Sequence, residues 1–219
     1  LLENNDPIGC PDDNTGRRKV KITDKSEVAA SAVRVWKLDG VVFTPTPLGG
    51  DIYEVTLQNP SSTMSVQPVV SLEVADGNGC TQSDAIQFTL YPRVDPDFTL
   101  TYVDPNGVTQ TFAPGSTLCP DIDGTLTATG TGISRFEWTI TNNGSTQEYH
   151  GEGTPYNYLF TNDSDNDLLY TVALKGINND KCSYTVTKNY GIHPSIKAAF
   201  TVKKIDECNP YKIQFIDQT

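Results

Sequence analysis

The stretch Val33-Arg34-Val35-Trp36-Lys37-Leu38-Asp39-Gly40 alternates apolar and polar residues around one tryptophan and ends in an Asp-Gly turn. Alternation with period two, built from β-branched and aromatic residues, is typical of a half-buried antiparallel strand. Similar stretches occur at residues 52–57, 70–74 and 85–90, each followed or preceded by turn residues. No segment carries a helical stripe of useful length. The sequence therefore predicts an all-β protein.

The tryptophan strand returns once along the chain at a fixed distance. Three landmarks recur after 102 residues (138 − 36, 182 − 80 and 200 − 98): Trp36 as Trp138, Cys80 as Cys182, and Phe98 as Phe200. A fixed period of domain length indicates a tandem array. We expect a β-sandwich in residues 1–93, a second in residues 94–195, and the first strands of a third in residues 196–219. The junctions at residues 91–93 and 193–195 are short and contain proline, which predicts an extended rod.

The five cysteines follow the same modular pattern. Cys10, Cys119 and Cys208 each lie early in a module, whereas Cys80 and Cys182 lie late. The economical pairing is within each full module, Cys10 with Cys80 and Cys119 with Cys182, which leaves Cys208 without a partner. Loops of that length would contribute about 4 kcal/mol each. Metal ligation is the alternative, but the chain has no Cys-x-x-Cys motif and no nearby histidine pair. Disulfides predict an oxidising compartment.

Charge and hydropathy narrow the range of partners. The chain carries 27 acidic and 16 basic residues, for a formal net charge of −11. Since no basic stripe is present, we do not expect a nucleic-acid partner. No stretch approaches the roughly 18 consecutive apolar residues that span a bilayer, so we expect no membrane insertion of this segment.

Three segments carry a family resemblance. They are the tryptophan strand Trp36-Lys37-Leu38-Asp39-Gly40, the hairpin sequence from Val70 to Cys80, and the opening strands at residues 199–202 and 208–219. With these, each module resembles the PKD (polycystic kidney disease) domain of large Bacteroidetes surface proteins. The resemblance implies tandem immunoglobulin-like sandwiches in a cell-surface adhesin of the gliding-motility kind, exported by the type IX system. The second module departs from the pattern, because Trp138 to Gly144 lacks the Gly-Asp-Gly ending.

From the resemblance and the repeat we expect a non-catalytic, extracellular segment that acts as a spacer or stalk at the cell surface. Its expected partners are neighbouring modules of the same chain, with glycan or surface ligands where the parent protein takes part in adhesion or gliding. The alternative is an accessory spacer of a secreted protease or glycan-degrading enzyme. No catalytic residue is predicted, because Gly-x-Ser-x-Gly and His-Glu-x-x-His are absent and His150 and His193 stand apart.

One acidic segment is a candidate ion site. Asp163, Asp165 and Asp167 alternate with Asn and Ser, and their carboxylates are the hard oxygen ligands that Ca²⁺ prefers. The glycine and glutamate of an EF-hand loop are missing, so the alternative is a solvated turn held by local side-chain hydrogen bonds. Calcium is the one cofactor for which we find candidate ligands.

Aromatic residues give the candidate binding surface. Tyr149, Tyr156 and Tyr158 lie in an insertion of the second module, and we expect them to be the tyrosines best placed to contact a partner. The alternative is that they pack their own loop. Trp36 and Trp138 could stack on sugars, but their position in mid-strand favours the core of a sandwich.

Overall fold

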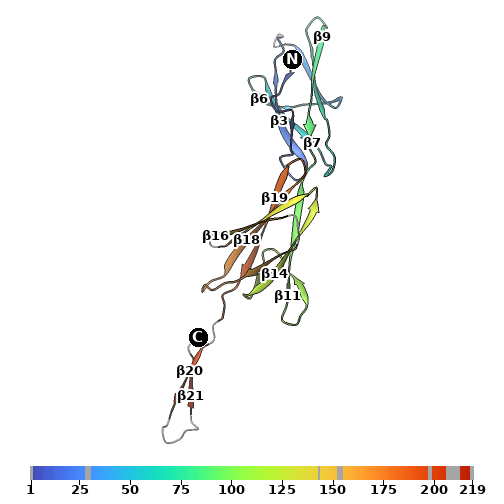
Figure 1. Ribbon diagram of the computed structural model, residues 1–219. Coiled ribbons are helices and arrows are strands. Elements are labelled where there is room, and N and C mark those ends of the chain that lie inside the picture. The colour runs from blue at the N-terminus through green and yellow to red at the C-terminus, as the bar shows by residue number, and fades with distance from the viewer. Residues whose placement is uncertain are drawn as a thin grey trace.

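The computed structural model describes residues 2–27, 31–142, 144–151, 155–196, 199–205 and 213–217. Within these residues every regular element is a β-strand, and the strands form separate, mainly antiparallel sheets (Figure 1). The predicted fold class, tandem β-sandwiches, is confirmed. Cys208 lies outside the described residues. No helix in the described part of the chain is long and apolar enough to cross a membrane.

The first sandwich is built from two four-stranded sheets. One sheet has the order β1 (Leu2–Glu3), β3 (Arg17–Asp24), β7 (Ile52–Gln58) and β6 (Thr46–Gly49). The other has the order β5 (Val41–Phe43), β4 (Val33–Leu38), β8 (Val69–Ala75) and β9 (Thr81–Gln87). A short parallel pair, β2 (Ile8–Gly9) with β10 (Thr89–Leu90), ends the module beside the linker.

The second sandwich also has two sheets, and the strands of its larger sheet are longer than their counterparts. One sheet has the order β12 (Thr109–Thr111), β11 (Asp95–Val103), β14 (Ile122–Thr131) and β17 (Tyr156–Phe160). The other has the order β13 (Thr117–Leu118), β19 (Ser183–Ile192), β18 (Leu168–Ile177), β15 (Arg135–Asn142) and β16 (Ser145–Gly151). A separate hairpin follows, formed by β20 (Phe200–Lys204) and β21 (Ile213–Asp217).

Each sandwich has its own core, and the two tryptophans occupy the same place in both. Trp36 pairs with Leu72 across β4 and β8, and Trp138 pairs with Leu174 across β15 and β18, 102 residues further on. The side chains are 5 % and 0 % exposed, so the prediction that they belong to the core is confirmed. Alternation within the strands places every second residue in the core, because successive side chains point to opposite faces of a sheet.

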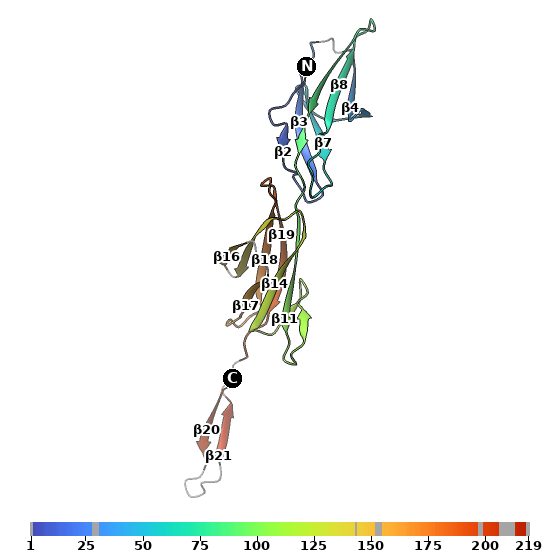
Figure 2. The same cartoon turned by 45° about the vertical axis from the view of Figure 1, so that its right-hand side comes forward.

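The two sandwiches lie end to end, and both views show the β20–β21 hairpin beyond the second one (Figures 1 and 2). The chain passes from the first sandwich to the second through Tyr91, Pro92, Arg93 and Val94. This linker is where the two modules meet.

Candidate functional site

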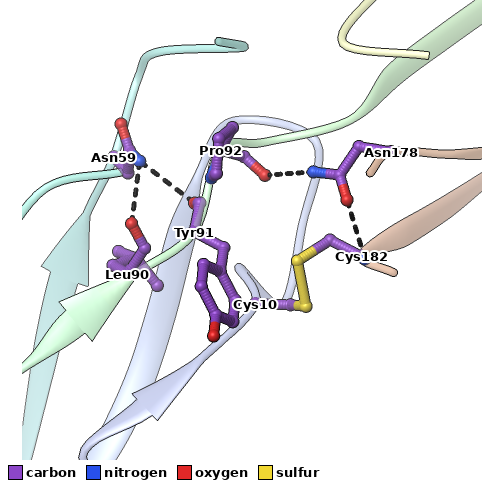
Figure 3. The surroundings of a disulfide bond; sticks show 7 residues. All are labelled: Cys10, Asn59, Leu90, Tyr91, Pro92, Asn178 and Cys182. Carbon is purple, nitrogen blue, oxygen red and sulfur yellow. Dashed lines mark hydrogen bonds between the residues drawn. A yellow bond between two sulfur atoms is a disulfide. The ribbon is translucent and has the colours of Figure 1, made fainter. Parts of the chain in front are cut away.

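A disulfide joins the two sandwiches at their junction. Cys10, directly after β2 of the first sandwich, is bonded to Cys182 at the start of β19 in the second, with Cα atoms 5.4 Å apart (Figure 3). Cys80 and Cys119 are free and exposed. The predicted pairing of Cys10 with Cys80 and Cys119 with Cys182 within each module is therefore wrong.

Strand length explains why that pairing cannot form. Cys80 precedes β9, while Cys10 lies beside β10, which follows β9. The seven residues of β9 span about 24 Å at roughly 3.4 Å per residue. In the second sandwich the ten residues of β19 hold Cys182 and Cys119 about 34 Å apart by the same measure. A disulfide requires Cα atoms within about 7 Å, so the two cysteines of one module sit at opposite ends of it.

Asn178 fixes the turn that carries Cys182 and reaches across the junction. Its side-chain oxygen accepts a hydrogen bond of 2.9 Å from the backbone N–H of Cys182. Its side-chain nitrogen donates a buried hydrogen bond of 3.0 Å to the carbonyl oxygen of Pro92 in the linker (Figure 3). One amide thus orders the β18–β19 turn and ties it to the linker.

The linker packs directly on the second sandwich. Val94 is 3 % exposed. A Cβ atom at Gly176 would lie 3.1 Å from side-chain atoms of both Val94 and Pro96, so glycine at this position of β18 allows the close approach. Apolar contact therefore adds to the disulfide in holding the modules together.

Arg93 ties the linker back to the first sandwich. Its Nε donates to the carbonyl oxygen of Pro60 and its Nη1 donates to that of Asn14, both at 2.8 Å. Nη1 also lies 2.8 Å from Oδ2 of Asp95, and the other carboxylate oxygen of Asp95 accepts a hydrogen bond from Asn14. A planar guanidinium suits this task because its donors diverge in fixed directions.

One buried asparagine holds the end of each sandwich, and neither was predicted from the sequence to have this role. The side-chain nitrogen of Asn59 lies 2.9–3.0 Å from the carbonyl oxygens of Met64, Leu90 and Tyr91. In the second sandwich Asn162 donates to the carbonyl oxygens of Asn166 and Ile192, both at 2.8 Å.

The sequence carries only a weak signal for the role of these two asparagines. Each asparagine is followed two residues later by a serine whose N–H its side-chain oxygen accepts, an arrangement common to many turns. Asn59 and Asn162 are 0 % and 1 % exposed, so each buried amide satisfies its own donors on backbone carbonyls at the end of its sandwich.

The candidate calcium segment is organised by Asn162. The hydroxyl of Ser164 donates to the Asn162 side-chain oxygen at 2.6 Å, and Asp167 lies 2.8 Å from Nδ1 of His193. In the part of the chain that the structure describes, no three His, Cys, Asp or Glu side chains lie where they could hold one metal ion. Calcium binding at Asp163, Asp165 and Asp167 stays a prediction.

The three candidate binding tyrosines are half-buried against the second core. The rings of Tyr149 on β16 and Tyr156 on β17 stack with centroids 4.5 Å apart and planes inclined by 10°. Because β16 and β17 are edge strands of opposite sheets, this stack joins the two sheets along one side. Tyr158 packs edge-on against Phe160 and Tyr170. Their packing role is visible, while ligand binding by these tyrosines stays a prediction.

No protein-family model and no curated protein matches this chain. Three solved structures resemble it weakly. A Ca²⁺-stabilized, ice-binding adhesin of an Antarctic bacterium has a TM-score of 0.36 and 12 % identity, over 92 % of this chain and 50 % of that one. A 1.5-MDa bacterial ice-binding adhesin has a TM-score of 0.33 and 14 % identity, over 95 % and 70 %.

The third is SGBP-B of the mixed-linkage glucan utilization locus of Bacteroides ovatus, in complex with a mixed-linkage heptasaccharide. Its TM-score is 0.27 at 10 % identity, over 96 % of this chain and 71 % of that one. This chain spans half the length of the first adhesin. All three likenesses have identities of 14 % or less and TM-scores of 0.36 or less.

Proposed function

We propose that this chain is a non-catalytic segment of an extracellular bacterial surface protein, in which tandem sandwiches act as a stiff spacer. The observation that carries the proposal is the junction, where Cys10–Cys182, Asn178 to Pro92 and the Arg93 contacts fasten one module to the next. These bonds restrict the motion of one module relative to the next, which is what a projecting stalk requires.

The disulfide also supports an extracellular location. Disulfides persist in oxidising compartments and are rare in the cytosol, so a cystine between two modules favours an exported chain. The net charge of −11 favours mutual repulsion between stalks over self-association.

The finer proposal is that the parent protein is an adhesin, with PKD-like modules and glycan or surface ligands bound elsewhere along it. An accessory spacer in a secreted protease or glycan-degrading enzyme is the rival, since a stiff joint would serve either. Export by the type IX system and a part in gliding motility stay predictions.

The deciding experiment is to shave intact source cells with protease and to size the largest polypeptide that carries these peptides. A cell-attached chain of several modules supports the adhesin. A released chain with one large non-repetitive domain supports the enzyme spacer, and peptides recovered only after lysis would contradict surface exposure altogether.

Stiffness is tested separately by small-angle X-ray scattering of the purified chain. We expect a maximum dimension no smaller than that of two sandwiches placed end to end, unchanged by salt concentration. A broad distribution of shorter dimensions would contradict the spacer role.

A further inference from the structure

The far end of the second sandwich repeats the surface that the first sandwich presents to the second. The backbone N–H of Tyr91 donates to the carbonyl oxygen of Gly9, and that of His193 donates to the carbonyl oxygen of Leu118, at 3.0 and 2.8 Å. Gly9 and Leu118 belong to the short strands β2 and β13, which pair in parallel with equivalent strand ends. Cys10 and Cys119, each the next residue, are therefore structurally equivalent despite their uneven spacing in the sequence.

Two further positions correspond. Pro92, whose carbonyl accepts from Asn178, is matched by Pro194, and Val94 is matched by Ile196, 102 residues further on. At the junction Val94 is 3 % exposed, because the hairpin of the second sandwich covers it, whereas Ile196 is 91 % exposed. Cys10 is half-buried in its disulfide, whereas Cys119 is exposed and free.

We propose that Cys119, Pro194 and Ile196 form the docking surface for the β-hairpin of a following module of the same polypeptide, and that Cys119 forms a disulfide with a cysteine in that hairpin. The joint would copy the one between the first two sandwiches. Each junction would then contain one disulfide between two modules. These disulfides would link successive sandwiches covalently along the polypeptide.

The second sandwich shows what the occupant must look like. Its docking hairpin reads Gly176-Ile177-Asn178-Asn179-Asp180-Lys181-Cys182. The glycine leaves room for the linker, the asparagine donates to the proline carbonyl, and the cysteine forms the bond. We therefore expect the partner hairpin to carry Gly-x-Asn-x-x-x-Cys.

The corresponding hairpin of the first sandwich does not meet these requirements. Val74 stands in place of Gly176, and Asp76 stands in place of Asn178. Hydrogen bonds from the backbone N–H groups of Cys80 and Asn78 hold the pKa of Asp76 below its usual range, so its carboxylate cannot donate to a carbonyl. A second copy of this chain, docking through Cys80, is thus not the occupant.

The bond forms by oxidation of two thiols. The thiol of Cys119 and that of the partner each lose a proton and together lose two electrons to a disulfide oxidant, either a thiol–disulfide oxidoreductase or a small disulfide. The oxidant is reduced to two thiols, and one S–S bond is made for the one that is broken.

The test is disulfide mapping of the natural polypeptide, with thiols blocked by N-ethylmaleimide before digestion without reduction. We expect the Cys119 peptide to be linked to a peptide containing Gly-x-Asn-x-x-x-Cys, and the Cys10–Cys182 pair serves as internal control. Recovery of Cys119 alkylated, or linked to Cys80 or Cys208, would overturn the proposal, as would absence of the Cys10–Cys182 pair.

A variant tests the docking surface itself. Ile196→Asp in the full polypeptide should lower the disulfide-linked fraction of Cys119 severalfold and leave Cys10–Cys182 intact. Val41→Asp, at an exposed valine of the first sandwich, is the matched control and should change neither. An unchanged Cys119 fraction in Ile196→Asp would contradict the assigned surface.

These outcomes are separable from the proposed spacer role. A free Cys119 would leave surface exposure and the first joint untouched, and a chain found inside the cell would remove the spacer role whatever the mapping showed.

Discussion

The linker between the two sandwiches and the segment that leaves the second sandwich have related sequences but different surroundings. Tyr91-Pro92-Arg93-Val94 becomes His193-Pro194-Ser195-Ile196. In the first segment Arg93 donates to two carbonyls and Val94 is buried, whereas in the second the backbone N–H of Ser195 donates to the carbonyl oxygen of Asn162 and Ile196 is almost fully exposed. Contacts with both neighbouring sandwiches thus distinguish the linker of the joint from the segment that leaves the second sandwich.

The largest effect should come from removing the disulfide. Cys10→Ser with Cys182→Ser opens a loop with a sequence separation of 172 residues, which is worth about 5 kcal/mol in the chain-entropy account. We expect a lower melting temperature and a wider range of angles between the sandwiches, measured by calorimetry and by distances between spin labels on the two modules.

The matched control is Cys80→Ser with Cys119→Ser, which removes two exposed thiols that form no bond in this chain. This control variant should leave the melting temperature and the range of angles between the sandwiches unchanged. Equal losses in the two double variants would mean that the Cys10–Cys182 joint does not constrain the modules.

The next effect concerns the two buried asparagines. Asn59→Ala removes three hydrogen bonds to backbone carbonyls and Asn162→Ala removes two, so each should destabilise its own sandwich by about 3 kcal/mol. Hydrogen exchange resolved by residue should localise the first loss to the first sandwich and the second loss to the second. Asn106→Ala, in an exposed turn, is the control and should change stability by about 0.5 kcal/mol or less.

Exchanging Asn and Asp between the two hairpin turns should affect them unequally. Asn178→Asp replaces the amide donor by a carboxylate that faces the carbonyl oxygen of Pro92, so it should weaken the joint by about 2 kcal/mol. Asp76→Asn keeps the side-chain oxygen that accepts from Cys80 and should have little effect. Chemical denaturation of the oxidised chain measures both, and a larger loss in Asp76→Asn would contradict the role given to Asn178.

The smallest effect is a response of the first sandwich to acid. Burial acts to raise the pKa of Asp24, but hydrogen bonds from Ser26 and Arg34 outweigh it and hold that pKa below its usual range. Since the folded pKa is lower than the unfolded one, the stabilisation is present above about pH 4 and is lost as the pH falls through the folded value.

Asp24→Asn should therefore flatten the dependence of stability on pH below about pH 4 and leave the second sandwich unaffected. Thermal unfolding between neutral and acidic pH checks this. A slope as steep in Asp24→Asn as in the parent chain would assign the acid response to other carboxylates.

The strands were predictable because the alternation of apolar and polar residues lies within each short segment of the sequence. Trp36 and Trp138 stand in alternating segments of β-branched residues, and such a segment has one apolar face wherever it is placed. The fixed distance between the tryptophans then identified equivalent strands, which is why the fold class could be read from the sequence.

The candidate site was less predictable. Asn59, Asn162 and Asn178 act through carbonyl groups that become neighbours only on folding, and asparagine near a turn is too common to mark them. Asp163, Asp165 and Asp167 drew attention as a cluster, yet Asp167 is paired with a histidine 26 positions away.

The amino-acid pattern alone was enough to predict the all-β class, the period of 102 residues and the burial of one tryptophan per module. Which cysteines form the disulfide depends on how the folded modules are stacked. Spacing along the chain favoured partners within a module, but extended strands carry those partners to opposite ends, and stacking the modules brings Cys10 beside Cys182. Residues at the two ends of an extended strand are far apart in space, because each residue adds about 3.4 Å. A junction between modules, in contrast, brings residues that are distant in the sequence into contact.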